Sequence, residues 1–489
     1  MTATALPRSW LSATLISALA VAIGLMAARH SSYALALAGV SVVALLAFTM
    51  PVTHLTLLLA LTAIVPYTIE NRYHAGGAGA GSPGLIASDL FLVTGMLRTA
   101  MVLPRLTLTR RQMTVIGLVI LSVLWTSFEA WQGFRAGQTL SNVGAEYRTL
   151  AGGIITALLA ITVLHEEPAQ RRMLRGLLLL GLALGLWGIA QWTLKLSFGT
   201  NFGVRPGVSL TSGGSGQLQG GLFGFPIAVV ISVGALTSGR LHGWRQLGPV
   251  VAVLVVNLIS LLLTFERTFW IAAIVGVLIV IVRAAPRQRY RALVWLLVTV
   301  TLGLAVLAAF SPGTLRTAEQ RLLSVGQYQV DNSVRYRVVE SGFVINKIKA
   351  KPLFGWGLAD TIFWGQPWEQ VPPTAASYTH VGYLWLFWRE GLIGGSIILV
   401  LLLLTMLWPG RPRGGDLLAG VRRGCQASIA VYLIVDFTFP AFQGSDSTYV
   451  MGLLIAMCAL PVLSRRTSGP PDQRPVLDSV AVNTPRPSA

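Results

Sequence analysis

The stretch VAVLVVNLISLLLTF, residues 251–265, is apolar on all sides when it is drawn as a helix. The run LVLLLLTMLW at 399–408 has the same character, and apolar runs of about 18 or more residues recur along the chain. A transmembrane β-barrel would instead alternate apolar and polar residues in short segments. With 54% hydrophobic and only 11% charged residues, the chain has more apolar surface than one soluble core can bury. The sequence therefore predicts an all-α polytopic membrane protein.

Basic residues between these runs predict how the chain crosses the membrane. They gather in short connections that alternate along the sequence, and such clusters mark cytoplasmic loops. The clusters are Arg105, Arg110 and Arg111; Arg171, Arg172 and Arg175; Arg240 and Arg245; Arg283, Arg287, Arg289 and Arg291; Arg411, Arg413, Arg422 and Arg423; Arg465 and Arg466. About 12–14 spans are expected, near 9–28, 33–50, 52–69, 84–103, 113–130, 149–164, 174–195, 220–238, 247–265, 268–283, 292–311, 391–408, 424–440 and 447–464. With a cytoplasmic start, every basic cluster falls inside.

One polar stretch, from about Ser311 to Thr379, interrupts the apolar runs and falls on the outer side. Long insertions are usually functional or disordered, and this one is too rich in aromatic residues and leucine for a disordered linker. We expect it to fold as an exterior (periplasmic) cap that carries catalytic residues. The predicted organisation is eleven transmembrane helices in 1–311, the cap in 312–379, the C-terminal transmembrane helices in 380–464 and a disordered cytoplasmic tail in 465–489.

Several function classes are disfavoured by the sequence. The net charge of +19 does not indicate nucleic-acid binding, because the basic residues lie in membrane loops and not in a compact basic domain. Cys425 and Cys458 both fall in apolar segments, so neither a disulfide scaffold nor a zinc site is indicated. There is no Gly-rich phosphate loop and no clustered Cys/His pattern. We expect no cofactor, no metal and no nucleic-acid partner, with the lipid bilayer as the environment.

The outward-facing cations point to a phosphate-bearing substrate. Arg forks pair with phosphate oxygens, and a charge near lipid is costly without a partner, so these residues indicate a lipid diphosphate. Arg267, Arg335 and Arg337 are the candidates for binding it, and Arg148 and Arg205 are secondary candidates. His380, at the far edge of the cap, can accept a proton from an incoming hydroxyl. The structural alternatives are a helix cap for His380 and a snorkelling anchor for Arg267.

Three motifs occur in a fixed order. TFERTFW at 264–270 places an arginine before an apolar span, R-x-R at 335–337 precedes PLFGWG at 352–357, and HVGYLWLFWREGLIGG at 380–395 follows the polar stretch. This order resembles the O-antigen ligase and O-antigen polymerase superfamily. The resemblance is densest from about 261 to 395, and the many spans and basic loops agree with it over most of the chain.

The resemblance implies roles for individual residues. His380 corresponds to the family's catalytic histidine, and Arg267 to its first essential arginine. Arg337 matches the second by its spacing to the PLFGWG motif, with Arg335 as the neighbouring candidate. Glu390 matches the glutamate of the family's E-G pair, and we take it as a secondary candidate.

Three departures from the family's pattern stand in this sequence. Val381 replaces the usual asparagine, and Ser341 stands where a helix tryptophan is common. The stretch 205–226 lacks the P-N pair that is often found there. The first two bear on how an acceptor would be held, and the third weakens any inference about that loop.

The resemblance implies a metal-independent, inverting membrane glycosyltransferase of the C type. Such an enzyme in the bacterial cytoplasmic (inner) membrane, with its active site facing the periplasm, moves a glycan from an undecaprenyl-diphosphate carrier to an acceptor hydroxyl. The acceptor is a lipid or another glycan, so an O-antigen ligase and a polysaccharide polymerase remain open. The main alternative of another class is a lipid-linked oligosaccharide flippase, although we see no inverted repeat. The residues alone lead to a phosphate-rich lipid and an exterior general base, and the sugar comes only from the resemblance.

Overall fold

The computed structural model describes residues 31–64, 87–196, 204–205, 217–218, 222–238, 241, 243–323, 332–364, 374–408 and 417–460. Its α-helices are α2 Ser31–Thr49, α3 Pro51–Ile64, α5 Ala87–Val102, α6 Arg110–Arg135, α7 Leu140–Val163, α8 Glu167–Thr193, α9 Gly224–Leu236, α10 Trp244–Leu263, α11 Arg267–Arg283, α12 Pro286–Phe310, α13 Pro312–Leu323, α14 Asn332–Ala350, α15 Gly382–Leu407, α16 Leu417–Val435 and α17 Ser445–Ala459. Two short antiparallel pairs of strands join them, β1 Val204–Arg205 with β2 Gln217–Leu218 and β3 Ile362–Trp364 with β4 Thr374–Ala376.

Eight helical segments in the described part of the chain are long and apolar enough to cross a membrane. They are Ala87–Arg105, Arg110–Arg135, Leu140–Val163, Glu167–Thr193, Trp244–Leu263, Pro286–Ala309, Gly382–Leu407 and Leu417–Val435, and four shorter apolar helices accompany them. The predicted span at 9–28 and the predicted tail at 465–489 lie outside the described residues. Each of the other predicted spans overlaps one helix. An all-α polytopic membrane protein is therefore confirmed.

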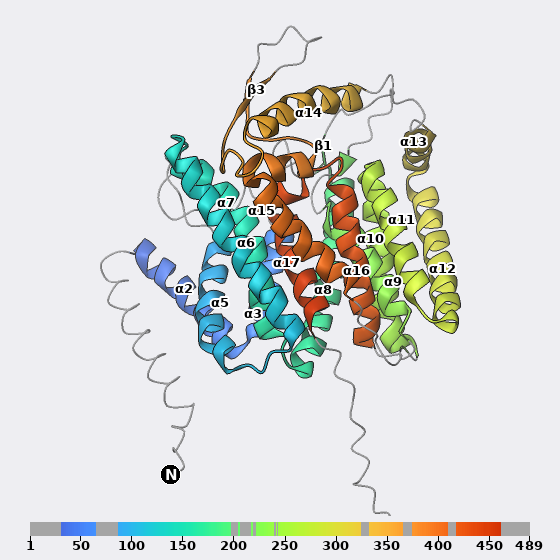
Figure 1. Ribbon diagram of the computed structural model, residues 1–489. Coiled ribbons are helices and arrows are strands. Elements are labelled where there is room, and N and C mark those ends of the chain that lie inside the picture. Colours follow the sequence, from blue (N-terminus) through green and yellow to red (C-terminus); the bar gives the residue numbers. More distant parts are fainter. Residues whose placement is uncertain are drawn as a thin grey trace, which may run out of the picture.

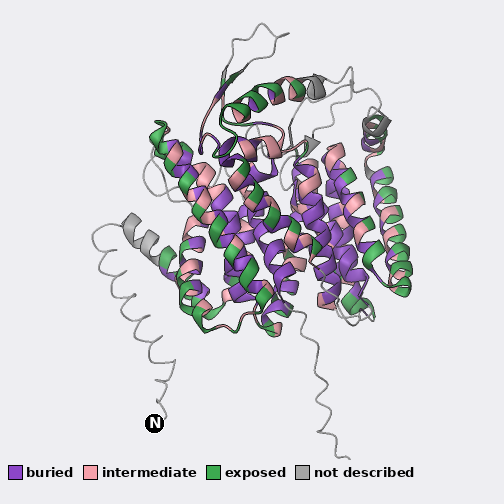
Figure 2. Cartoon of the chain, viewed as in Figure 1, coloured by how far each residue is buried: buried purple, intermediate pink, exposed green. Residues whose placement is uncertain are grey.

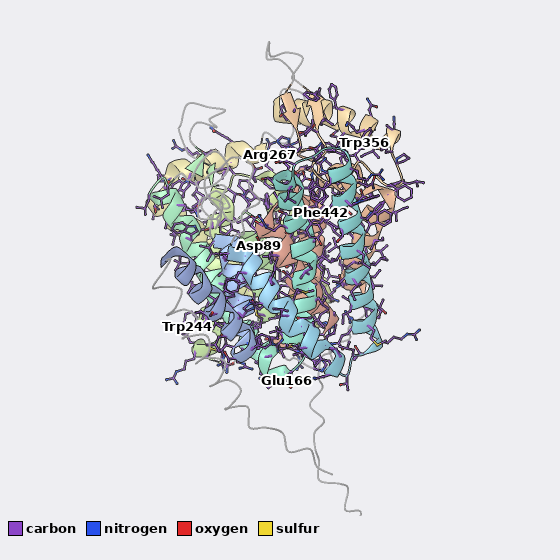
Figure 3. The ribbon with its side chains drawn as sticks, turned by 90° about the vertical axis from the view of Figure 1, so that its left-hand side faces the viewer. Asp89, Glu166, Trp244, Arg267, Trp356 and Phe442 are labelled. Atoms are coloured by element: carbon purple, nitrogen blue, oxygen red, sulfur yellow. The ribbon has the colours of Figure 1, made fainter. Side chains whose placement is uncertain are left out.

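The long helices run side by side, and α14 lies across the upper end of the bundle (Figure 1). Arg267 and Trp356 lie toward this upper end, whereas Glu166 and Trp244 lie toward the lower end (Figure 3). Buried residues fill the interior of the bundle (Figure 2). The outward side of α12 exposes large apolar side chains such as Leu297, which is 68% exposed. A surface of this kind suits lipid.

Helix α15 begins earlier than the sequence indicated. The prediction started this span at about 391, just after the charged residues Arg389 and Glu390. In the structure both side chains are fully buried, and Arg389 has partners that compensate its charge. Its Nη2 donates to Glu146 Oε1 at 2.8 Å and its Nη1 to the carbonyl of Asp360 at 2.6 Å. A charge that is paired and hydrogen-bonded can lie in a protein interior.

Gly391 breaks α15 into two helical pieces, with φ 62° and ψ −177°. The PLFGWG segment satisfies the backbone groups that the break exposes. Trp356 N–H donates to the Trp388 carbonyl at 3.0 Å, and Leu392 N–H donates to the Pro352 carbonyl at 2.8 Å. Irregular backbone at membrane depth is tolerated only where protein satisfies it. The motif at 352–357 is therefore the partner of the helix break.

The two backbones approach each other so closely that only glycine fits. A Cβ on Gly355 would overlap the carbonyl of Arg389, and a Cβ on Gly391 would overlap the carbonyl of Leu353. Both glycines also have positive φ angles, 70° and 62°, which other residues rarely adopt. These two requirements explain Gly355 of the PLFGWG motif and Gly391 of the E-G pair by packing alone.

Replacing Gly355 by alanine should destabilise the fold. Backbone strain of this kind costs about 1–3 kcal/mol before the overlap is counted. We expect Gly355→Ala to lower the midpoint of thermal unfolding in detergent. Gly117→Ala is the matched control, because a Cβ at Gly117 meets nothing within 4 Å and alanine is favoured in a helix by about 0.5–1 kcal/mol. Equal midpoints for the two variants would show that the backbone pairing does not hold the fold.

Candidate functional site

His380 lies between β4 and α15, and a buried carboxylate from α14 holds it. Glu340 Oε2 accepts the backbone N–H of His380 at 2.9 Å and lies 3.1 Å from ring Nδ1. The Glu340 side chain is 1% exposed and the His380 side chain 28% exposed. A carboxylate only accepts hydrogen bonds, so it favours the tautomer with the proton on Nδ1. Nε2 then carries a free lone pair, which is what a general base needs.

Two tyrosines flank the imidazole edge-on. The ring centroids of Tyr336 and Tyr378 lie 5.2 and 4.9 Å from that of His380. Burial of the Tyr378 phenol raises its pKa, and the Glu340 carboxylate raises it further, whereas the Arg337 guanidinium lowers it. The phenol therefore stays protonated near neutral pH and can donate a hydrogen bond, but it does not compete with His380 as a base.

The backbone on both sides of His380 is also held. The Thr379 carbonyl accepts from Gln443 Nε2 at 3.0 Å, and Gly382 N–H donates to the Asp436 carbonyl at 2.9 Å. A Cβ on Gly382 would overlap the Asp436 carboxylate, so no larger residue fits there. The imidazole is thus placed by three separate segments, which limits its freedom before any substrate arrives.

Arg337 and Glu340 leave polar atoms without partners beside His380. Both residues lie on α14, one turn apart. Arg337 Nε and Glu340 Oε1 are buried and have no hydrogen-bond partner. Such atoms are rare in native proteins and call for an explanation. A donor and an acceptor left open one helical turn apart are suited to a polar ligand.

The TFERTFW motif forms the tight turn between α10 and α11. Phe265 has a φ of 50°, which is uncommon for a residue other than glycine. Trp270 Nε1 donates to the Leu261 carbonyl at 2.7 Å and so binds the start of α11 to the end of α10. Arg267 is the first residue of α11, at the upper end of the bundle (Figure 3).

This turn faces the His380 region. Thr268 and Thr438 share a hydrogen bond of 2.6 Å between their hydroxyls, and the 436–438 segment is the one that holds Gly382. The Tyr378 phenol lies within electrostatic range of Glu266 as well as of Arg337. The structure therefore brings His380, Arg337 and the turn that carries Arg267 to one region, although they are far apart in the sequence.

The other candidates have different surroundings. Arg148 Nε lies 2.8 Å from Asp89 Oδ1, an ion pair that joins α7 to α5. Glu390 lies at the helix break, where its Oε2 accepts from Thr126 at 3.3 Å. It is ten residues from His380 in the sequence and lies about 12 Å along the helix from the start of α15. The side chains of Arg205, in β1, and Arg335, in α14, lie outside the described residues.

Sequence reasoning missed three residues of this cluster, Glu340, Tyr336 and Tyr378. Tyr336 and Glu340 are four residues apart on the helix that carries Arg337, so a helical wheel of 332–350 places them on one face. The pattern alone does not show which residue that face meets. That information comes from the packing of α14 on the chain just before α15.

An open groove of about 520 Å³ lies elsewhere on the same end of the molecule, lined by Phe128, Gln132, Lys351, Pro352, Leu353, Phe354 and Gly355. It follows the end of α14, roughly 15 Å along the helix from Glu340. The groove is therefore distinct from the His380 cluster. Among the described residues, no group of three or more His, Cys, Asp or Glu side chains could hold a metal ion.

The geometry predicts the tautomer of His380. We expect neutral His380 to carry its proton on Nδ1, facing Glu340, because the carboxylate accepts from that nitrogen. Solid-state NMR on protein labelled with ¹⁵N-histidine would show this signal, and its loss in His380→Ala would assign it. Glu340→Ala should return the ring toward the Nε2–H form. A dominant Nε2–H tautomer in the unaltered protein would contradict the proposed orientation.

One comparison with known proteins gives a match. Residues 252–399 match the family described as O-Antigen ligase. This segment is less than a third of the chain, and it contains Arg267, Arg337, Glu340 and His380. No curated protein gives a significant match to the sequence. Over these residues the chain is similar to the O-antigen ligase family, and the eight long apolar helices of the described residues are those of a multi-pass membrane protein.

Proposed function

We propose that this protein transfers a glycan from an undecaprenyl-diphosphate carrier to an acceptor hydroxyl, as an O-antigen ligase. The family match supports an activity of the O-antigen ligase or polymerase type on lipid-linked glycans. The observation that carries the finer proposal is the contact between His380 Nδ1 and the buried carboxylate of Glu340, 3.1 Å apart, beside Arg337. This arrangement leaves Nε2 of His380 as the basic nitrogen, and the neighbouring Tyr378 lies within electrostatic range of Arg337.

In the proposed reaction His380 acts as general base. Nε2 takes the proton of the acceptor hydroxyl, and the oxygen then bonds to the anomeric carbon of the glycan. The bond between that carbon and the diphosphate oxygen breaks, and its electron pair leaves with the carrier diphosphate. Attack from the side opposite to the leaving group inverts the anomeric centre. No step in this sequence requires a metal ion, and the fold would be a glycosyltransferase of the C type.

Arg337 and Arg267 are proposed to stabilise the diphosphate as its charge grows. Guanidinium groups bind phosphate oxygens in pairs, and fixed positive charge is most effective where water is limited. The buried Nε of Arg337, which has no partner, is available for such a bond. Residues two positions apart on a helix point in different directions. We therefore assign the diphosphate contact to Arg337 before Arg335.

Glu340 is proposed as a positioning residue. Its carboxylate fixes the ring through Nδ1 and stabilises the imidazolium that forms when Nε2 takes the proton. An aspartate has the same relation to histidine in Ser-His-Asp triads, where it is not itself protonated. Arg205, Arg148 and Glu390 stay secondary candidates, and the ion pair of Arg148 with Asp89 favours a structural role for that residue.

We propose that the site faces the exterior of the cytoplasmic membrane and that 312–379 forms the exterior cap. The distribution of charge supports this orientation. Glu166, close to the cluster at 171–175, and Trp244, beside Arg245, lie toward the end opposite Arg267 (Figure 3). Clusters of this kind favour the cytoplasmic side.

The decisive experiment uses the purified protein and a defined undecaprenyl-diphosphate glycan. One reaction offers lipid A core as acceptor, and a second offers another carrier-linked repeat. A product of core size plus one glycan supports the ligase, whereas a ladder of repeats identifies a polymerase. Absence of any transfer, together with movement of the donor across liposomes, would identify a flippase and overturn the proposal.

Replacing His380 should abolish transfer without loss of the fold. General base catalysis contributes about 10²–10⁴-fold, so we expect at least a 100-fold loss of kcat in His380→Ala. Glu340→Gln should reduce kcat by about 10-fold or more with little change in KM, because it acts through His380. Steady-state kinetics would measure kcat and KM of both variants, provided that their unfolding midpoints are unchanged. Full activity of His380→Ala would refute the mechanism.

Replacing Arg337 should weaken donor binding by more than the loss of one positive charge explains. A hydrogen bond to a charged group is worth about 1.5–3 kcal/mol, so Arg337→Ala should weaken donor use by about 10–100-fold. Arg337→Lys should recover only part of this, because lysine lacks the bidentate fork. The matched control is Lys349→Gln, an exposed cation on the same helix. A similar loss in the control would assign the effect to general charge.

A further inference from the structure

Two arginines meet at the lower end of the bundle, far from His380. Arg111 lies in the first turn of α6 and Arg422 lies in α16. The Nη2 atoms of both donate to the same acceptor, the carbonyl of Cys458 at the end of α17, each at 2.5 Å. Two guanidinium groups on one oxygen must lie close together and repel each other.

The local charge is not balanced by the described part of the chain. No described carboxylate forms an ion pair with Arg111 or Arg422, and Arg283 is a third cation within electrostatic range of Cys458. A helix C-terminus supplies only about half a negative charge. The partial negative charge at the C-terminus of α17 therefore compensates less than half of the positive charge of these arginines.

The two arginines also have unused donors. The Nε atoms of Arg111 and Arg422 are buried and have no hydrogen-bond partner. Arg422 is only 6% exposed, so water does not readily satisfy it. A buried cation without a negative counter-charge is costly, and an arginine near the membrane surface that lacks a carboxylate is suited to phosphate.

Neighbouring residues place this cluster at a membrane interface. The guanidinium carbon of Arg111 lies 5.1 Å from the ring centroid of Trp408, and the Trp408 carbonyl accepts from Gln426 Nε2 at 3.1 Å. Tryptophan favours the headgroup region of a bilayer. Basic pockets between transmembrane helices on the cytoplasmic side bind anionic lipid headgroups.

We propose that Arg111 and Arg422 form a binding site for a phosphate group at the end of the bundle opposite His380. The chemical class of the ligand is an anionic phosphate, carried by a phospholipid headgroup or free in solution. The Nε and Nη donors of both arginines bind its oxygens. The site does not depend on the proposed glycosyl transfer, and its ligand joins α6, α16 and the end of α17.

Thermal unfolding of the full-length protein in detergent tests the site. Dioleoyl phosphatidylglycerol is added in one arm, dioleoyl phosphatidylcholine in a second, and inorganic phosphate against chloride of equal ionic strength in a third. We expect phosphatidylglycerol to raise the midpoint more than phosphatidylcholine does, since a ligand that binds only the folded state stabilises it. A rise with inorganic phosphate as well assigns the site to phosphate from either source. If neither phosphatidylglycerol nor inorganic phosphate raises the midpoint, the proposal is overturned.

Matched variants separate this site from general effects of charge and burial. Arg111→Gln and Arg422→Gln should lose most of the midpoint rise, and Arg422→Lys should retain part of it if the glutamine variant does not fold. Arg110→Gln removes an exposed neighbour on α6, and Arg423→Gln removes a buried neighbour that donates to Thr237. Both controls should keep the full rise. An equal rise in Arg111→Gln, Arg422→Gln and the two controls overturns the assignment.

Discussion

The backbone pairing between 352–357 and the break in α15 is the constraint on which the rest of the upper end depends. A helix that opens at Gly391 exposes carbonyl and N–H groups that lipid cannot satisfy. The PLFGWG segment supplies the missing bonds, and it follows directly from α14. Because the segment is fixed on α15, the helix before it is fixed as well. The side chains of α14 can then meet the residues just ahead of α15, which include His380.

The His380 cluster shows how a site is assembled from segments that carry little chemistry individually. Glu340 orients the imidazole, Tyr336 and Tyr378 enclose it, and Asp436 receives the first turn of α15. The turn before α11 brings a further arginine to the same region and accepts a strained backbone at Phe265 to do so. Strain of this kind costs about 1–3 kcal/mol and persists where the surroundings fix it, often at functional sites.

The sequence predicted the class of fold and most helices, because long apolar runs leave few alternatives. It also led to His380, Arg267 and Arg337 through motif order. It did not reveal Glu340, whose pairing with His380 arises only when two distant segments pack. It also placed the start of α15 too late, since Arg389 looks like the end of a span until its bonds to Glu146 and Asp360 are known. Charges that are compensated by distant residues are invisible to local patterns.

The break at Gly391 divides α15 into two helical pieces that are continuous in sequence. A residue with a positive φ does not pass tilt or rotation along a helix axis as a continuous turn does. Residues 352–357 bond to both pieces, to Trp388 and Arg389 above the break and to Leu392 and Ile393 below it. The upper piece also accepts from the indole of Trp125, and the lower piece runs through the bundle toward Trp408. A tilt of the lower piece in a bilayer that thickens or thins is therefore passed to the upper piece through residues 352–357 and not through a continuous helical turn.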